Sequence, residues 1–260
     1  MKIPYYHVDA FTNKRFSGNP AGVCLLADWA SDDVLQNIAN ENNLAETAFV
    51  IQRQSQFDLR WFSPTTEIDL CGHATLASAH VLFQHLGYQP DTITFETRSG
   101  KLKVTRASDL LTLDFPSRPA TGCAPPTDLI QALGRTPVHT GKARDYLAVL
   151  DSEKAVRELQ PDLNAVSRLD CLGVIVTAPG DHCDFVSRFF APSIGVPEDP
   201  VTGSAHCTLI PYWAERLGRS RMHARQLSRR GGELFCELHG GRVGIGGHAV
   251  TYHAGFIELT

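Results

Sequence analysis

The sequence predicts an α+β protein of two pseudo-symmetric domains, each a mostly antiparallel sheet rolled around a central apolar helix. Three observations carry this prediction. A strand–loop–helix segment occurs twice, and both copies end in Leu-Gly after an apolar helix. Near the C-terminus, short apolar strands alternate with glycine pairs, which is typical of hairpins. The duplicated segment therefore organises the whole chain.

The repeat shows as identical residues at constant offsets. The first set lies 128 positions apart and pairs Arg60 with Arg188, Phe62 with Phe190 and Pro64 with Pro192. After a three-residue insertion, the second set lies 131 positions apart and pairs Glu67 with Glu198, Gly72 with Gly203 and Gly87 with Gly218. Identities on both sides of one small insertion indicate an internal duplication.

The first half combines strands with two helices. Ser31 is a suitable N-cap, with two aspartates in the first turn of a helix that ends near Asn40. A second helix, residues 72–86, is apolar on more than one face, as expected of a helix wrapped by a sheet. A turn is expected at Gly18-Asn19-Pro20. Strands are expected at residues 5–11, 22–26, 44–51, 57–61, 92–95, 101–104 and 110–115.

A linker rich in proline and glycine follows Phe115 and separates the halves. We divide the chain into an N-terminal repeat, residues 1–116, and a C-terminal repeat, residues 117–260. The last strand of the chain is a candidate to pair with the sheet of the first domain. In the second repeat, helices are expected at 127–133, 152–160, 162–166 and 203–217, and strands at 146–150, 173–178, 185–190 and in the hairpins after 226.

Composition excludes several function classes. Of 260 residues, 43% are hydrophobic and 20% charged, as in soluble globular proteins, and the net charge of −4 disfavours a nucleic-acid partner. No apolar run approaches the roughly 20 residues of a membrane helix, and no signal-peptide pattern is present. Seven cysteines without a Cys-x-x-Cys pair predict reduced thiols and a cytoplasmic protein. Eleven histidines without a ligand spacing predict no metal site.

Glu46 is the first candidate for chemistry. On the strand expected at 44–51 it shares one face with Ala48 and Val50, so it is a carboxylate among apolar neighbours. One interpretation is a solvent-facing glutamate of no special role. The other is a proton-transfer group, because desolvation favours its protonated form.

The two repeated helices begin at Gly72-His73 and Gly203-Ser204. The first N–H groups of a helix lack backbone partners and carry partial positive charge, so two such ends directed at one cleft would hold a small carboxylate. Each pair taken alone is an ordinary helix start. The occurrence of both in register favours a binding site.

Several segments together resemble the signature sequences of the PhzF-like (phenazine-biosynthesis-like) family. They are Gly18-Asn19-Pro20-Ala21, residues 43–49, Cys71-Gly72-His73-Ala74-Thr75, residues 198–205 and Gly241-Arg242-Val243. The resemblance covers nearly the whole chain. It implies the diaminopimelate-epimerase-like fold, with the site between two domains, and a cofactor-free isomerase that moves a proton on a small carboxylic acid, often as a homodimer. In the characterised member the substrate is trans-2,3-dihydro-3-hydroxyanthranilate.

The resemblance also implies residue roles. Glu46 would be the general acid/base. His73, Asp199 and Ser204 would place the substrate, and the amides at Gly72 and Gly203 would help to bind its carboxylate.

Two alternatives stay open. An amino-acid racemase or epimerase of the same fold uses one thiol from each repeat. Cys71 sits where the first thiol would be, but the equivalent position is Thr202, and Cys207 lies further into the helix. The residue types therefore disfavour a two-cysteine racemase. A non-catalytic protein that binds small acids would need the helix ends but not an aligned base.

Overall fold

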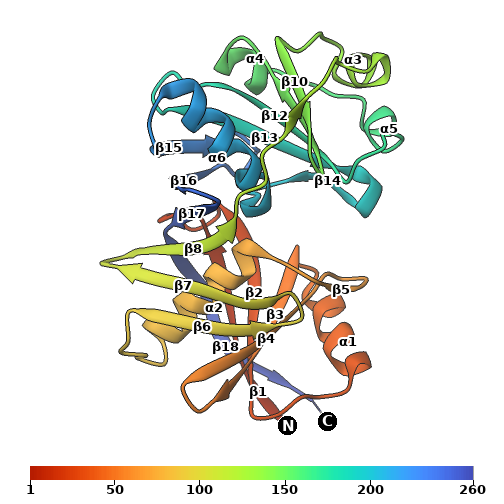
Figure 1. Ribbon diagram of the computed structural model, residues 1–260. Coiled ribbons are helices and arrows are strands. Elements are labelled where there is room, and N and C mark those ends of the chain that lie inside the picture. The colour runs from red at the N-terminus through yellow and green to blue at the C-terminus, as the bar shows by residue number, and fades with distance from the viewer. Residues whose placement is uncertain (260) are drawn as a thin grey trace. The chain divides into compact units, whose positions relative to one another are not determined.

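The structure is a computed structural model that describes residues 1–259 (Figure 1). The chain folds as two compact units, one made of residues Met1–Asp114 with Gly246–Thr260 and the other of residues Phe115–Ile245. The mixed, sheet-dominated α+β architecture confirms the predicted fold class. Within residues 1–259, no helix has the length and apolar composition needed to cross a bilayer.

The first unit is a sheet built outward from β1. Strand β1 pairs with β18 and β2, β2 with β3, β3 with β4, β4 with β5 and β6, β6 with β7, and β7 with β8. Of these pairs, β2–β3 and β4–β6 are parallel and the others antiparallel. The strands are β1 Lys2–Ala10, β2 Asn19–Leu26, β3 Glu46–Arg53, β4 Gln56–Phe62, β5 Glu67–Ile68, β6 Thr92–Thr97, β7 Gly100–Ala107, β8 Leu110–Pro116 and β18 Ala249–Glu258.

Helix α2, Gly72–Gln84, lies within the curve of this sheet and contacts β1, β2, β3 and β18 (Figure 1). Eleven of its 13 residues are buried, as its apolar character on more than one face predicts. It ends two residues earlier than expected, because His85 forms the C-cap. Helix α1, Asp32–Asn42, buries a single stripe, Leu35, Ile38 and Ala39, against β3 and β4.

The second unit repeats this pairing scheme. Strand β10 pairs with β9 and β11, β11 with β12, β12 with β13, β13 with β14 and β15, and β15 with β16; of these pairs, β11–β12 and β13–β15 are parallel. Thus β4 with β5 and β6 corresponds to β13 with β14 and β15. The strands are β9 Thr121–Gly122, β10 His139–Lys142, β11 Tyr146–Val149, β12 Val174–Pro179, β13 Phe185–Ala191, β14 Val196–Asp199, β15 Arg221–Gln226, β16 Gly232–His239 and β17 Arg242–Gly247.

Helices cover both faces of the second sheet. Helix α6, Gly203–Leu217, packs Trp213 flat on Phe185, and the indole donates to Thr177 at 3.0 Å. The opposite face carries Val174, Val176 and Phe190 against three short helices. These are α3 Thr127–Leu133, α4 Glu153–Arg157 and α5 Leu163–Val166, and the 3-10 turn η1, Pro192–Ile194, follows β13.

The same ion pair recurs at the same place in both units. Arg60 on β4 donates to both carboxylate oxygens of Glu67 on β5, at 2.7 and 2.8 Å. Arg188 on β13 likewise donates to both carboxylate oxygens of Glu198 on β14, at 2.7 and 3.0 Å. Such two-pronged pairs fix orientation as well as distance. Each therefore ties a central strand to the short strand that leads into the long helix, which explains why these identities mark the repeat.

Candidate active site

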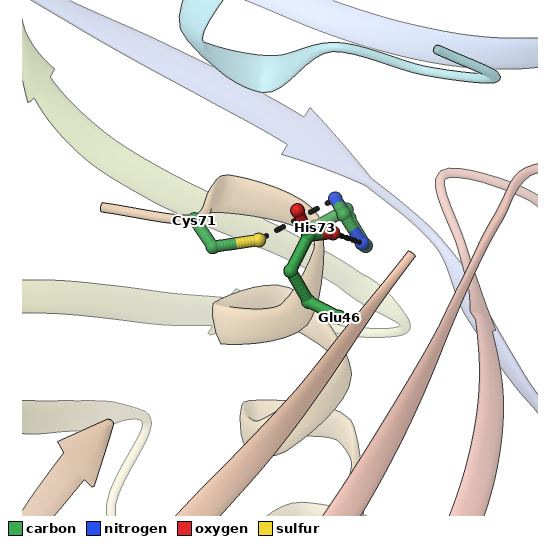
Figure 2. Close-up of side chains that lie close together, drawn as sticks. All are labelled: Glu46, Cys71 and His73. Carbon is green, nitrogen blue, oxygen red and sulfur yellow. Dashed lines mark hydrogen bonds and ion pairs between the residues drawn. The ribbon is translucent and has the colours of Figure 1, made fainter. Parts of the chain in front are cut away.

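Three side chains meet at the start of α2. Cys71 is the N-cap, with φ −138° and ψ 111°, but its side chain makes no capping bond. Its Sγ atom lies 3.6 Å from Nδ1 of His73, the second residue of the helix (Figure 2). Both residues are buried. Sulfur accepts hydrogen bonds less well than a hydroxyl or carboxylate oxygen, so a cysteine is a poor N-cap. The thiol lies against the imidazole instead. The N-cap side chain therefore gives the first N–H groups of the helix no acceptor.

Glu46 opens β3 and reaches the same point (Figure 2). Its neighbours Phe49 and Ile51 point at α1, so the face that carries Glu46 and Ala48 is the opposite one. Oε2 of Glu46 lies 3.0 Å from Nε2 of His73, with 17% of the glutamate side chain exposed. The contact has the distance of an ion pair but not the direction of a hydrogen bond, and neither atom has a hydrogen-bond partner within residues 1–259. Both retain bonding capacity toward a ligand.

Asn19 is a site residue that sequence reasoning placed in a turn and in a segment of the family resemblance, without assigning it a role. It is fully buried at the start of β2, and its Nδ2 lies 3.2 Å from Nδ1 of His73. Gly18 permits this entry, because it has φ +66° and a side chain there would meet the Ala10 carbonyl at 2.2 Å. An amide can donate to a neutral imidazole or, rotated, accept from a charged one. Asn19 can therefore orient His73 in either protonation state. The available signal was its place in the Gly18-Asn19-Pro20-Ala21 segment.

Charge couples the three side chains. Burial, reinforced by the Glu46 carboxylate, raises the pKa of the Cys71 thiol, so the thiol is protonated at neutral pH. Burial alone would lower the pKa of His73, but the negative charges that Cys71 and Glu46 can carry outweigh it and hold this pKa well above its usual value. Both neighbours therefore favour the protonated imidazole.

This coupling predicts the titration of His73. Its NMR midpoint should lie above about 6.5, the ordinary value for histidine, and should fall in a Glu46→Gln variant. Because the folded pKa is raised, protonation of His73 stabilises the fold fully below about pH 6.5, and this contribution is lost as the pH rises through the folded pKa. A wild-type midpoint below about 6.5, or one that Glu46→Gln leaves unchanged, would contradict the coupling.

The second unit places its candidate residues at the start of α6. Thr202 is the N-cap, the same role that Cys71 has in α2, and its hydroxyl donates to Asp199 at 2.5 Å. Gln226 accepts from the Thr202 amide at 2.9 Å and donates to the Asp199 carbonyl at 2.8 Å. These two hydrogen bonds of Gln226 fix the loop before Gly203. Sequence reasoning did not single out Gln226, because its partners are far from it in the chain.

Ser204 has a partner that the sequence did not indicate. Arg144, in the loop between β10 and β11, donates to its hydroxyl at 3.1 Å. The same guanidinium contacts both carboxylate oxygens of Asp145, at 3.3 and 3.1 Å, and only 1% of the Asp145 side chain is exposed. Ser204 is thus held beside the Arg144–Asp145 ion pair. Cys207 is buried, 3% exposed, in the next turn of α6.

The structure gathers the predicted residues within each unit. Glu46, Gly72 and His73 lie together in the first unit, with Cys71 and Asn19 added. Asp199, Gly203 and Ser204 lie around the start of α6 in the second, with Gln226 and Arg144 added. Among residues 1–259, Glu46, Cys71 and His73 form a group whose potential metal-ligand atoms, one from each residue, all lie within 4.8 Å of one another.

Comparison with known proteins gives one consistent result. Residues 8–255 match the family model described as phenazine biosynthesis-like protein. A Pseudomonas aeruginosa protein described as an uncharacterized isomerase is 51% identical over 100% of both chains. The crystal structure of an Enterococcus faecalis protein of the PhzF family is 46% identical and superposes with a TM-score of 0.98 over 100% of both chains.

A more distant comparison concerns the fold alone. A hydroxyproline epimerase from Agrobacterium vitis, solved with bound trans-4-hydroxy-L-proline, is 12% identical, with a TM-score of 0.64 over 98% of this chain and 92% of its own. The fold is therefore shared with an epimerase of very different sequence.

Proposed function

Since the chain belongs to the phenazine biosynthesis-like (PhzF) family and is an isomerase-type enzyme, we propose that it moves a proton on a small carboxylic acid, with Glu46 as its single acid/base and no cofactor. The observation that carries the proposal is the Glu46 carboxylate, 3.0 Å from the buried His73 at the start of α2. A base is thus placed where a helix presents unpaired N–H groups.

The chemistry follows from these groups. Glu46 removes a proton from a C–H bond next to a conjugated carboxylate, and the electron pair spreads into the conjugated system. The negative charge that develops is stabilised by the N–H groups at the start of α2 and by protonated His73. Glu46 then returns the proton to a different carbon. No atom is gained or lost, so the product is an isomer.

Asp199, Gly203 and Ser204 are proposed to bind the substrate. Two features of the second unit support this role. Thr202 uses its hydroxyl on Asp199 and not on the helix, so the first N–H groups of α6 have no side-chain cap from that residue. Arg144, which is paired with the buried Asp145, also donates to the Ser204 hydroxyl and so fixes its position.

A two-thiol racemase remains the weaker candidate. Cys71 and Thr202 are the N-caps of α2 and α6, so they occupy equivalent positions in the repeat. A threonine hydroxyl cannot replace a thiol as an acid/base, because its proton is far less acidic. The pair required for two-base racemisation is therefore incomplete in this chain.

Hydrogen exchange in D₂O tests the proposal directly. The purified protein should catalyse deuterium incorporation at a carbon of trans-2,3-dihydro-3-hydroxyanthranilate, or of another conjugated small acid in a panel, as followed by NMR and mass spectrometry. Trans-4-hydroxy-L-proline serves as the contrasting probe. An acid that raises the melting temperature saturably without exchanging would identify a binding protein. Exchange at the α-carbon of hydroxyproline, with the epimer formed, would identify an epimerase.

A further inference from the structure

The cluster of Glu46, Cys71 and His73 has a chemical property that proton transfer does not use. A carboxylate, a thiol and an imidazole are the three side-chain types that most often bind zinc. The sequence predicted no metal site, because these residues lack a recognisable ligand spacing. The fold brings them together, since β3 supplies one ligand and the first turn of α2 supplies the other two.

The distances suit a tetrahedral ion. With Zn–S of about 2.3 Å and Zn–N and Zn–O of about 2.0–2.2 Å, the ligand atoms of a tetrahedral site are about 3.4–3.6 Å apart. Sγ of Cys71 and Nδ1 of His73 are already 3.6 Å apart. Glu46 lies closer to the other ring nitrogen, Nε2, at 3.0 Å. One ligand atom from each residue lies within 4.8 Å of the other two, so the side chains must rotate to bring a single ring nitrogen, the thiolate and the carboxylate to tetrahedral distances.

A second observation points to a ligand at this place. Nε2 of His73 and Oε2 of Glu46 are buried and lie 3.0 Å apart, and beyond this contact neither has a hydrogen-bond partner within residues 1–259. His73 is only 5% exposed, so water satisfies this polar edge poorly. A cation that bonds to these buried atoms would satisfy them better than this single contact does.

From this geometry we infer that Glu46, Cys71 and His73 bind Zn²⁺, with a fourth position open, and that the bound ion blocks proton transfer. The second half of the inference rests on the proposed function, since Zn²⁺ would occupy the carboxylate lone pairs that Glu46 needs as a base. Binding requires Cys71 as a thiolate and His73 as a neutral imidazole, so it releases the thiol proton and the proton that the imidazolium carries. The site therefore couples enzyme activity to free zinc.

The test begins with metal binding alone, in the full-length protein and without substrate. ZnCl₂ titrated into chelator-treated protein by calorimetry should show one ion per chain, with proton release that differs between buffers of different ionisation enthalpy. MgCl₂ should not compete, because thiolate and imidazole ligands are too soft for Mg²⁺. Cys71→Ser should weaken zinc affinity by more than about 100-fold, since the loss of an outer-sphere partner alone costs about 10–100-fold.

Two matched variants make the result specific. Serine is a preferred N-cap, so Cys71→Ser keeps the start of α2 folded. Cys123→Ser, at an exposed cysteine, should bind zinc like the wild type. Zinc affinity that is unchanged in Cys71→Ser, or lost equally in Cys123→Ser, would overturn the site.

Activity then tests inhibition separately. Zinc should slow hydrogen exchange by the wild type, and EDTA should restore it. If Glu46→Gln still exchanges hydrogen, the proposed base is wrong, yet one-to-one binding lost in Cys71→Ser would still establish the metal site. Exchange that zinc accelerates would overturn the inhibitory role.

Discussion

Replacing Glu46 by glutamine should slow hydrogen exchange by about 10²–10⁴-fold, the usual contribution of a positioned acid/base group. Glutamine keeps the shape of the side chain at the start of β3 but cannot take up a proton. Because Glu46 is half-buried and its Oε2, which faces His73, makes no hydrogen bond within residues 1–259, the fold should persist. Exchange rates in D₂O, with circular dichroism to verify folding, provide the measurement.

The Cys71→Ser variant, in metal-free buffer, is the comparison that assigns the base. It removes the only thiol that corresponds to a racemase cysteine in the first repeat while retaining the carboxylate. In a single-carboxylate enzyme, Glu46→Gln has much the larger effect. Full activity of Glu46→Gln, or turnover abolished by Cys71→Ser but not by Glu46→Gln, would contradict the mechanism.

Arg188→Met should lower the free energy of unfolding by about 3–5 kcal/mol, the cost of removing one partner from a buried ion pair. Only 11% of the arginine side chain is exposed. Besides gripping Glu198, it donates to the carbonyl oxygens of Val156 and Leu159 at 3.2 and 2.7 Å, which ties β13 to the region of α4. Methionine fills the space but removes this donor from the Leu159 carbonyl and from the Glu198 carboxylate. Chemical denaturation measures the effect.

Arg221 supplies a matched control for this experiment. Its Nε lies 2.7 Å from Glu237, the same separation as between Arg188 and Glu198, but 82% of its side chain is exposed. Water and salt screen an exposed pair, so Arg221→Met should change the unfolding free energy far less. Equal losses in the two variants would show that burial does not set the strength of the Arg188 pair.

The duplication shows how far sequence reasoning can go in this chain. Arg60 with Glu67 and Arg188 with Glu198 were found as identities at two offsets, and each forms the same two-pronged pair between corresponding strands. The sequence was sufficient to find these pairs because the two partners of each pair lie within about ten residues of each other. The apolar character of α2 likewise predicted a helix enclosed by its sheet.

The short strands were harder to predict. Strands β5 and β9 have two residues each, and β10 and β14 have four, so none is long enough to show a hydrophobic period. Sequence reasoning left them in loops. They are strands because each pairs with the free backbone N–H and C=O groups of another strand. That partner strand is distant in the sequence or is separated by a turn.

The sequence by itself determined the duplicated α+β architecture, the burial of the two long helices and the helix starts at Gly72 and Gly203. These depend on periodicity, glycine and local pairs, which act over a few residues. Only the tertiary structure decided which side chains surround His73. Asn19, Glu46 and Cys71 reach it from three segments of the chain. Their hydrogen bonds, charges and metal-ligand distances exist only once β2, β3 and α2 are packed together, because such contacts act through space and leave no period along the chain.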